Sequence, residues 1–520
     1  MPRKSCLLVL WAGLVAAGSA GGQERSIQLG KHRQLFVDDY VIAQMVGVRR
    51  VLNRPRKHPA NPVVVADRPW EGLCVYIRGT VLHSREERVF RMWYSGIAPG
   101  KRAWCYATSR DGVHWQKPEL GLVEFGGSKA NNLLGWDSPR TVMHTPNDSD
   151  PARRYKALLG KRGAFSPEGL RWRYGGSQSM KGNIASDNVT MACHDASHGR
   201  YIGFAKVNVT SGKHMRRSVA VGLSSDFLTW SPAKIALVPD ARDDELARQR
   251  MPALRSHVCY DDGPAWYLSQ FYLMAGFPYE GMYLGMLEVF DISGWPPGKP
   301  RRPGAGGEDG IAQVQLTSSR DLLRWDRVCD RDVFISVGEA GTWEAGWIGT
   351  VSRPIVVEDE IWIYYGGLQT SHAGPWLSAD APGHKEVAAD YARKARERGK
   401  RHGAGGIGLA TLRLDGWVSI DAGDEAGQLT TKLLVLERGT RRLLINAKAR
   451  KGGVAVEILD ADGRPCDGYS KDECRVFVGD AIRHTVRWRG GCDLSRLAGT
   501  TIRLRFHLRN AKLYSFVFAA

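Results

Sequence analysis

The chain has 520 residues, of which 43% are hydrophobic, 24% charged and 9% aromatic, and it contains 60 glycines, 24 prolines and 17 tryptophans. This length excludes a single small binding module, and the composition excludes a disordered or fibrous protein. Lysine and arginine number 73 against 54 acidic residues, a formal net charge of +19 that favours anionic partners. Because these basic residues are spread along the chain without a nucleic-acid-binding motif, we expect no nucleic-acid partner.

The first 22 residues have the pattern of a secretory signal peptide. Basic Arg3 and Lys4 precede an apolar run over residues 7–17, and small residues follow at 18–22. The apolar run is shorter than the about 20 residues that a membrane-spanning helix needs, and no later segment is long enough either. The sequence therefore predicts an exported protein, periplasmic or extracellular, without stable membrane insertion.

The cysteine pattern does not indicate a disulfide-built scaffold or structural zinc. One of the nine cysteines lies in the predicted signal peptide, and the other eight are sparse and form no CxxC pair. Cys466 and Cys474 are close enough to bridge a hairpin, with buried free thiols as the alternative. No acidic loop has a recognisable calcium-binding spacing. We expect no metal and no cofactor.

Strand patterns dominate residues 35–420, as short apolar or alternating runs separated by glycine, aspartate and proline. The clearest runs are residues 89–96, 200–207, 265–272 and 360–367. One exception is the charged, alanine-rich segment 385–398, which predicts a solvent-exposed helix within an insertion over about residues 376–403.

A short motif, S-x-D-x-x-x-W, recurs three times in the chain. The copies lie at residues 109–115, 224–230 and 319–325. The aspartate suits a turn, and the tryptophan is placed to pack as the next strand begins. We therefore interpret Asp111, Asp226 and Asp321 as hairpin residues and exclude them from the functional site.

A longer similarity relates residues 70–96 to residues 343–367. Each begins with Trp-Glu, passes through an apolar strand and ends in aromatic residues followed by glycine. Repeated sheet units with a tight turn and a sealing tryptophan are typical of β-propeller blades. Near the C-terminus the pattern changes to alternating apolar and polar residues with glycine or aspartate turns, which predicts an antiparallel β-sandwich. We expect an all-β protein, with a five-bladed β-propeller over residues 23–417 and a β-sandwich over 418–520.

Segments from nearly the whole chain after the signal peptide carry a family pattern. They are QLFVDDYVIAQMVGVRRVLNRPRKHPANPVVVADRPWEG, FRMWYSG, YATSRDGVHW, DPARRYK, FPYEGMYLG, EIWIYYGG and LRNAKLYSF. This pattern resembles exported bacterial proteins described as similar to glycoside hydrolase families 32 and 43. The resemblance implies a five-bladed propeller followed by a β-sandwich, with a carbohydrate-active pocket at the propeller axis. It also implies three acidic residues from different blades, acting as nucleophile or base, as acid and as an orienting helper.

The hydrolase signatures themselves are replaced in this chain. The family 32 signature W-M-N-D-P-N-G gives way to Arg68-Pro69-Trp70-Glu71-Gly72, and the R-D-P signature is at best Ser149-Asp150-Pro151. The resemblance therefore implies the fold more than the individual site residues. It implies nothing about linkage specificity.

Glycoside hydrolysis needs two carboxyl groups that flank the scissile bond, one protonated and one ionised. Glu71 lies in a tryptophan-rich turn before a candidate inner strand and is predicted as nucleophile or base, with a turn acid bound to backbone amides as the alternative. Glu280 lies among aromatic and apolar residues that would raise its pKa, which suits a general acid. A buried structural glutamate is the alternative there.

Three further acids are candidates for the same site. Asp39 follows Asp38 on a predicted strand, where only one of the two side chains can face a pocket. Asp150, before a proline, is predicted as the helper carboxylate, with a turn-fixing loop acid as the alternative. Glu344 repeats the Trp-Glu setting of Glu71 and is predicted to face the same axis.

Four residues are candidate substrate ligands. Trp70, Tyr279 and Trp343 would be stacking platforms for sugar rings, or core aromatics if they do not line the pocket. His372 follows a predicted inner strand and would bind a sugar hydroxyl or carboxylate, with an ordinary loop histidine as the alternative.

The sequence thus predicts an exported carbohydrate-active enzyme, a glycoside hydrolase that acts on a poly- or oligosaccharide. The basic charge favours an acidic or sulfated one, with Arg78 and Arg353 as candidate rim groups. One alternative is a noncatalytic propeller that binds glycan or serves as a scaffold. Another is a phosphorolytic relative, which would need arginine, lysine or histidine at the pocket to hold phosphate. Two carboxyl groups within about 10 Å across a pocket would favour hydrolysis over binding.

Overall fold

The computed structural model describes residues 25–98, 101–136, 141–159, 162–175, 191–304, 306–351, 353–374 and 405–520. Within this part of the chain the structure is almost entirely β, with one α-helix, α1 (Ala241–Arg250). None of the described helices is both long and apolar enough to cross a membrane. The predicted signal peptide and the predicted helix at 385–398 lie outside the described residues.

Short 3₁₀ helices interrupt the loops between strands. They are η1 (Pro69–Glu71), η2 (Pro151–Arg153), η3 (Met251–His257), η4 (Pro264–Trp266), η5 (Val328–Arg331), η6 (Lys471–Glu473) and η7 (Ser495–Leu497).

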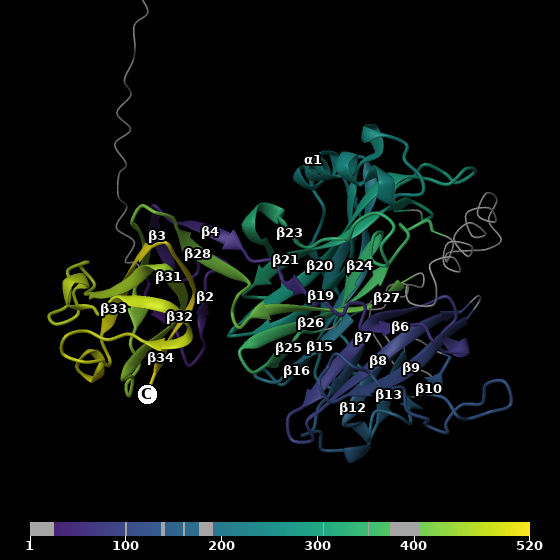
Figure 1. Cartoon of the computed structure of the whole chain (residues 1–520), viewed down its shortest axis with the longest axis horizontal. Coiled ribbons are helices and arrows are strands. Elements are labelled where there is room, and N and C mark those ends of the chain that lie inside the picture. The colour runs from purple at the N-terminus through teal and green to yellow at the C-terminus, as the bar shows by residue number, and fades with distance from the viewer. Residues whose placement is uncertain are drawn as a thin grey trace, which may run out of the picture.

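Most of the chain forms one large unit of packed sheets (Figure 1). Three antiparallel sheets have four strands each. The first contains β7 (Cys74–Ser84), β8 (Val89–Ala98), β9 (Lys101–Ser109) and β10 (Leu133–Gly135), and the second contains β11 (Thr141–His144), β12 (Tyr155–Leu159), β13 (Arg162–Ser166) and β14 (Arg173–Tyr174). The third contains β15 (Met191–Asp195), β16 (Arg200–Ser211), β17 (His214–Ser224) and β18 (Lys234–Leu237).

A larger sheet of eleven strands completes this unit. It contains β19 (Ser269–Tyr279), β20 (Met282–Gly294), β21 (Asp309–Ser319), β22 (Asp326–Arg327), β23 (Val333–Ile335), β24 (Trp347–Thr350), β25 (Ile355–Val357), β26 (Glu360–Leu368), β27 (Gly405–Arg413), β5 (Arg56–Lys57) and β6 (Val64–Val65). Its two halves meet in one parallel pairing of β21 with β24, at Ala312 and Trp347.

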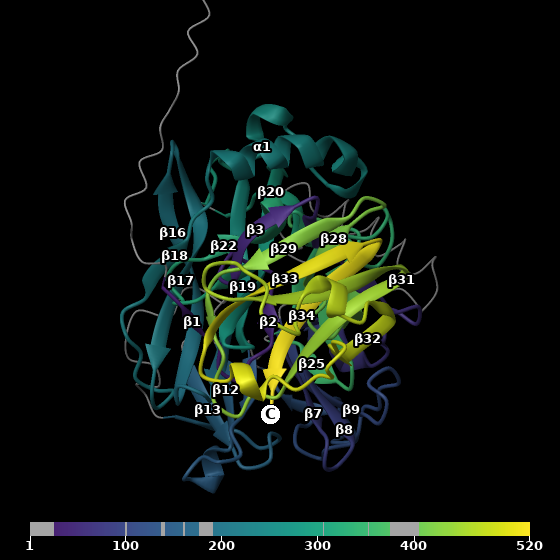
Figure 2. The same ribbon diagram turned by 90° about the vertical axis from the view of Figure 1, so that its left-hand side faces the viewer.

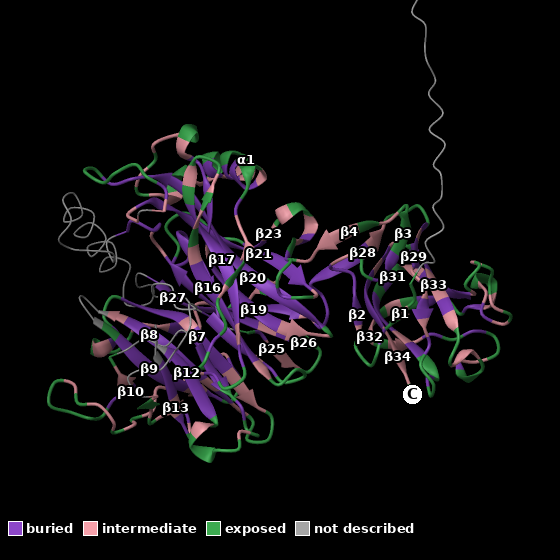
Figure 3. Cartoon of the chain, turned by 180° about the vertical axis from the view of Figure 1, so that it is seen from behind, coloured by how far each residue is buried: buried purple, intermediate pink, exposed green. Residues whose placement is uncertain are grey.

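The first strands of successive sheets contact one another. β7 contacts β11, β11 contacts β15, and β15 contacts β19, while β24 contacts both β20 and β7. The last sheet therefore packs against the first. Strands β20, β21 and β24 are buried along their whole length, and Figure 3 shows much of the centre of this unit in the colour of buried residues. Strand β20 is buried along its whole length, which explains its nearly continuous apolar sequence. The structure thus shows a curled arrangement of sheets, and the closed five-bladed propeller stays a prediction.

The S-x-D-x-x-x-W motif forms the same turn after β9, β17 and β21. In each copy the aspartate Oδ1 accepts the backbone N–H groups two and three residues further on, at 2.7–2.9 Å. The tryptophan Nε1 donates to the carbonyl oxygen three residues before it, at 2.8–3.1 Å. The interpretation of Asp111, Asp226 and Asp321 as turn residues is confirmed.

A fourth copy of this turn follows β13, with Glu168 in the place of the aspartate. Ser166 Oγ accepts the N–H groups of Glu168 and Gly169, and Glu168 Oε1 accepts the N–H of Arg171 at 2.8 Å. The residue after the acid has a positive φ in all four copies: Gly112 74°, Gly169 82°, Phe227 71° and Leu322 71°. One turn therefore recurs after the third strand of four successive sheet units.

The second unit is a curled sheet of eleven strands from both ends of the described chain (Figures 1 and 2). Its strands are β1 (Ile27–Gln28), β2 (Gln34–Leu35), β3 (Ile42–Val46), β4 (Arg49–Leu52), β28 (Val418–Ala422), β29 (Gly427–Thr431), β30 (Leu434–Val435), β31 (Arg442–Leu459), β32 (Phe477–Thr485), β33 (Thr501–Arg509) and β34 (Ala511–Ala519).

The N-terminal strands belong to this second sheet rather than to the large unit. The sequence predicted residues 23–417 as one unit, but β2 pairs with β34, β3 with β29 and β4 with β28. The apolar side chains of Phe36, Val41 and Ile42 pack into the core of the C-terminal sheet, and this burial accounts for the pairing.

All eight described cysteines are free thiols. Cys466 and Cys474 are therefore not bridged, and the alternative of free thiols is confirmed for them. Cys474 is buried, and its Sγ lies 3.2 Å from the Val456 backbone nitrogen, within hydrogen-bonding distance for sulfur.

Asp415 joins the two units at a buried junction. Its carboxylate accepts hydrogen bonds from Arg33 Nε at 2.8 Å, Tyr279 Oη at 2.7 Å and Ser515 Oγ at 2.7 Å. These donors come from the N-terminal segment, from β19 and from β34. Arg33 also donates to Glu280 from its backbone N–H and its guanidinium, both at 2.8 Å. The end of the β19–β20 hairpin is thereby fastened to the second sheet.

We predict that Asp226→Ala lowers the free energy of unfolding by about 1–2 kcal/mol, because two backbone N–H groups of the turn lose their acceptor. Urea denaturation of the full chain measures the change. Asp226→Asn retains one carbonyl acceptor and is expected to recover most of the loss. Equal stability of Asp226→Ala and the parent would contradict a stabilising role for this turn.

Candidate functional site

Aromatic and ionisable side chains from several sheets gather around Tyr272 of β19, and β24, which carries one of them, contacts both β7 and β20. This central cluster comprises Tyr76, Arg78, Lys206, Arg217, Tyr272, Glu288, Glu308, Trp347 and His372. On β7, Tyr76 and Arg78 alternate with Val75 and Ile77, which pack into an apolar cluster instead.

An irregular stretch of β7 carries Arg78. Between Tyr76 and Thr80 the strand advances by four residues while its partner β8 advances by two, from Ser95 to Trp93. Bulges of this kind redirect side chains and are frequent beside active sites. Gly79 permits the close approach, because a Cβ there would lie 2.3 Å from the Trp93 carbonyl oxygen.

Glu288 is a fully buried acid of the central cluster. Neither of its carboxyl oxygens is bonded to a described residue. The Thr350 backbone and the Trp347 indole face the carboxyl, but neither makes a hydrogen bond to it in this structure. The nearest charge is Arg78, whose Nη2 lies 3.7 Å from Oε2. Burial raises the pKa of Glu288 to about 7, although Arg78 opposes the increase.

Glu288 is one of several buried polar groups in and beside the central cluster that lack a hydrogen-bond partner among the described residues. Tyr76 Oη, Trp347 Nε1 and Thr350 Oγ1 are also buried without a described hydrogen-bond partner. Gly349 permits Tyr76 and Glu288 to approach the backbone of β24 closely, since a Cβ there would lie 1.9 Å from Tyr76 Oη and 2.8 Å from Glu288 Oε1. Buried polar groups are normally paired, so this concentration indicates a place where a ligand or water completes the bonding.

Three cations surround the ring of Tyr272. Arg78 Cζ lies 5.1 Å from the ring centroid, Lys206 Nζ 5.2 Å and Arg217 Cζ 5.5 Å. Such distances permit cation–π attraction. The ring itself is half-buried. It therefore presents an aromatic surface with positive charge on its sides.

The second carboxyl of the central cluster, Glu308, is held in an ionised state. Its oxygens accept two bonds from Arg217, at 3.0 and 3.1 Å, one from Gln270 at 3.2 Å and one from the Gly304 N–H at 2.7 Å. Burial alone would raise the pKa of Glu308, but the Arg217 guanidinium lowers it below its ordinary value. The environments of Glu288 and Glu308 thus move their pKa values in opposite directions, as in catalytic carboxyl pairs.

His372 connects Glu308 to Tyr272 as a neutral imidazole. Its Nδ1 lies 2.6 Å from the Glu308 carbonyl oxygen and its Nε2 3.3 Å from Tyr272 Oη. Because a carbonyl oxygen can only accept, Nδ1 carries the proton and Nε2 accepts from the tyrosine hydroxyl. Burial, followed by the nearby Arg217, lowers the pKa of His372 to about 4.

The predicted acid Glu71 lies in η1, in a separate, fully bonded setting. Its carboxylate accepts the backbone N–H groups of Asp67 and Arg68, at 2.9 and 3.0 Å, and the Tyr94 hydroxyl at 2.6 Å. It also forms an ion pair with Lys117 at 2.7 Å. This is the arrangement expected for a turn acid bound to backbone amides. A catalytic role for Glu71 stays a prediction.

Glu344 and Trp343 precede β24 and pack against β5 and β26. Glu344 Oε1 lies 3.0 Å from Lys57 Nζ, and Trp343 stacks on Tyr365 with ring centroids 5.8 Å apart. The predicted platform Trp70 is likewise engaged in packing. Its Nε1 donates to an asparagine side chain at 2.7 Å, and its ring lies edge-on to Phe125.

Asp39, Asp150, Glu280 and Tyr279 lie away from the central cluster. Asp39 is 72% exposed in the second unit and pairs with Arg50. Asp150 begins η2 and accepts the Ala152 N–H at 2.9 Å, as a turn-fixing acid does. Glu280 occupies the β19–β20 turn with φ 46° and binds Arg33, so the apolar setting expected for it is not observed. Tyr279 bonds to Asp415 at the junction.

Of the predicted site residues, the structure places His372 in the central cluster. Arg78, predicted as a rim group, lies there as well. Glu288 was not among the predicted residues, although a single acid within the apolar run LGMLEVF is a signal that could have identified it. Glu308, Tyr272 and Arg217 carried no such local signal.

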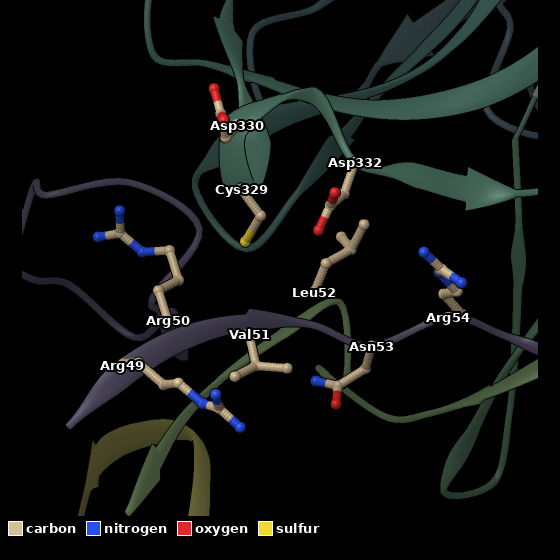
Figure 4. A pocket seen from close by; sticks show the side chains of 9 residues that line it. All are labelled: Arg49, Arg50, Val51, Leu52, Asn53, Arg54, Cys329, Asp330 and Asp332. Atoms are coloured by element: carbon tan, nitrogen blue, oxygen red, sulfur yellow. The ribbon is translucent and has the colours of Figure 1, made fainter. Parts of the chain in front are cut away.

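A separate hollow of about 790 Å³ lies at the junction of the two units (Figure 4). Its lining residues are Arg49, Arg50, Val51, Leu52, Asn53, Arg54, Cys329, Asp330 and Asp332. Cys329 and Asp330 are in the left-handed region, with φ of 49° and 51°, although neither is glycine. The hollow has no aromatic side chain among its lining residues, so it does not offer a stacking surface for a sugar ring.

Comparisons with known proteins give only distant matches. No protein-family model and no curated protein matches the chain. The structure is similar to a glycosyl hydrolase from Bacteroides ovatus, with 14% identity over 74% of this chain and 97% of that one and a TM-score of 0.38. It is also similar to a glycoside hydrolase family 43 arabinoxylan arabinofuranohydrolase from Bacillus subtilis, with 10% identity over 90% and 99% of the two chains and a TM-score of 0.34.

A third similar structure comes from the GH130 family of mannoside phosphorylases, described as containing glycoside hydrolases that target β-1,2 mannosidic linkages in Candida mannan. It has 14% identity over 74% of this chain and 97% of that one, with a TM-score of 0.36. TM-scores below 0.5 at such identities do not establish a shared fold or activity. Function is therefore inferred from the central cluster itself.

We predict that Glu288→Gln becomes more stable relative to the parent as the pH rises. The pKa of Glu288 is about 7 in the folded chain, against an ordinary value of 4.5. Between pH 4.5 and pH 7 the carboxyl ionises in the unfolded state but not in the folded state, so the parent loses stability as the pH rises through this range. The difference between variant and parent should grow by about 3 kcal/mol from pH 4 to pH 8. Denaturant unfolding at a series of pH values measures it.

Glu308→Gln is the matched control, with the opposite sign. The pKa of Glu308 is lowered in the folded chain, so ionised Glu308 stabilises the parent at pH values above its ordinary pKa. This contribution is lost as the pH falls and the carboxylate is protonated. A pH-independent difference for Glu288→Gln would contradict the raised pKa.

We predict that Glu71→Gln lowers the free energy of unfolding by about 2–4 kcal/mol, because Lys117, which is 7% exposed, loses one of its two carboxylate partners. Glu119→Gln, an exposed change in the neighbouring loop, is expected to stay within about 0.5 kcal/mol of the parent. Thermal and urea unfolding of both variants test this, and equal effects would contradict the structural role of Glu71.

Proposed function

We propose that the protein is a glycan-active hydrolase whose site is the central cluster. The observation that carries the proposal is Glu288, a buried carboxyl with a pKa near 7, aromatic neighbours and no hydrogen-bond partner in the described part of the chain. An acid that retains its proton near neutral pH can protonate the leaving oxygen of a glycosidic bond. The half-buried ring of Tyr272 supplies a surface on which a sugar can stack.

We further propose that the curled sheets form a five-bladed propeller with the central cluster near its axis. The contacts of β7 with both β11 and β24 support this arrangement, as does the turn that recurs after four third strands. In such a ring, residues distant in the chain converge where the first strands meet.

The ionised partner that hydrolysis also requires is proposed as Glu308. Arg217 keeps its carboxylate charged, and His372 links its backbone to Tyr272. The sequence-based candidates for catalytic roles remain predictions: Glu71 as nucleophile or base, Glu280 as general acid, Asp150 as helper, and Asp39 and Glu344 as further acids of the site. Glutamine or asparagine substitutions test each of them beside Glu308.

A second candidate function is noncatalytic glycan binding, which one observation favours. The oxygens of Glu308 are already occupied by Arg217, Gln270 and Gly304. A carboxylate so bonded would have to rearrange before it could activate water. Binding of a glycan by the parent without any cleavage would identify this function.

We predict that Glu288→Gln lowers kcat/KM by about 10²–10⁴-fold on any glycan that the parent cleaves. The parent's rate should fall about tenfold for each pH unit above 7, as Glu288 loses its proton. A panel of neutral and acidic glycans, followed by chromatography of released sugars, measures both effects. Asp226→Asn, in a turn remote from the chemistry, is the control and should retain the parent rate. Full activity of Glu288→Gln would remove Glu288 from the mechanism.

A further inference from the structure

We propose that Arg78 and Arg102 form a subsite for an oxyanion carried by the ligand, either a carboxylate or sulfate of an acidic glycan or a free phosphate. This inference rests on the proposed function, because it describes the substrate of the same site. It goes beyond the overall basic charge, since it assigns the anion to two named side chains.

The strand register places Arg102 on the face of its sheet that carries Tyr76. Cys74 on β7 is paired with Ile97 on β8, and Ile97 with Arg102 on β9. Residues paired directly across antiparallel strands project to the same face, and Cys74, Tyr76 and Ile97 pack together in one cluster with Trp347. Arg102 therefore lies on the side of the first sheet that faces the central cluster.

Arg102 is accessible and makes no ion pair or hydrogen bond with the described residues. Its side chain is exposed to solvent, in contrast to the buried Tyr76. Its pKa is lowered, first by partial burial and then by the charge of Arg78. Two guanidinium groups thus influence each other without an acid between them.

Within the described ranges, neither carboxyl group of the cluster neutralises Arg78 and Arg102. Glu308 is bound to Arg217. The acid in contact with Arg78 is Glu288, 3.7 Å away, and this acid holds a proton over much of the range below pH 7. Positive charge in a partly buried site is costly without a counter-charge. An oxyanion between Arg78 and Arg102 would supply it.

The chemistry of the two side chains fits an oxyanion. Guanidinium groups form paired N–H···O bonds with carboxylate, sulfate and phosphate, and such bonds are stronger than neutral ones. Arg78 is 12% exposed at its side chain and is flanked by the rings of Tyr76 and Tyr272, at 5.4 and 5.1 Å. The rings orient this guanidinium while leaving part of it open to a ligand.

Isothermal titration calorimetry of the full chain tests the proposal with four probes. These are oligogalacturonides, their methyl esters, chondroitin sulfate oligosaccharides and inorganic phosphate. We expect at least one oxyanion probe to bind, with an affinity that Arg102→Gln lowers by tenfold or more. Arg438→Gln is the control, because it removes an exposed positive charge of the second unit and should leave binding unchanged.

The probes identify the source of the oxyanion. Binding of oligogalacturonides that is lost on methyl esterification, or binding of chondroitin sulfate, assigns the subsite to an acidic glycan. Binding of phosphate alone assigns it to the free ion. Absence of binding by every oxyanion probe, or equal affinities of Arg102→Gln and the parent, would overturn the proposal.

Activity separates this inference from the proposed function. If Glu288→Gln and the parent both bind an oxyanion probe but the parent cleaves no glycan, the subsite is supported and hydrolysis is not. If the parent cleaves a neutral glycan and Arg102→Gln does so at the same rate, hydrolysis is supported and the subsite is not.

Discussion

An ionisable side chain that is removed from water must meet an opposite charge or change its protonation state. The central cluster contains both solutions. Glu308 meets Arg217 and stays charged, whereas Glu288 has no hydrogen-bond partner among the described residues and has a pKa raised to about 7. The chemistry inferred for the site follows from this difference in partners between two buried carboxyl groups.

The backbone around the cluster makes these two outcomes possible. Gly349 lets Glu288 and Tyr76 approach the β24 backbone more closely than a residue with a side chain would, and the bulge of β7 places Arg78 at 3.7 Å rather than at bonding distance. A closer arginine would have turned Glu288 into an ordinary ion pair with a lowered pKa. Small details of strand geometry therefore determine whether this acid can donate a proton.

Local patterns predicted much of the fold but little of its long-range pairing. The turn after β9, β17 and β21 depends on side-chain bonds within seven residues, so its motif was visible in sequence, and the copy at Glu168 was missed only because the acid differs. The pairing of β1–β4 with C-terminal strands joins segments hundreds of residues apart. Their register depends on which apolar side chains fill a shared core, and no local pattern encodes that.

The same contrast applies to the site. His372 was predicted from its place after an inner strand, and that strand indeed ends beside the cluster. Glu280 was chosen for its aromatic neighbours in sequence, but a tight hairpin turns it outward to Arg33. Glu288 lies one strand further on, within an apolar run that resembles core. Its neighbours Arg78 and Trp347 come from other strands, so its environment exists only once the sheets have assembled.

The arrangement of the two units also constrains how the chain can be divided and made. Because the second sheet takes strands from both ends, residues 53–417 are in effect inserted within it. A cut at residue 418 would therefore leave two fragments, one with orphaned N-terminal strands and one with an incomplete core. During synthesis β1 to β4 are translated before the large unit, and their partner strands are translated after it. The large unit can therefore fold while β1 to β4 are still unpaired.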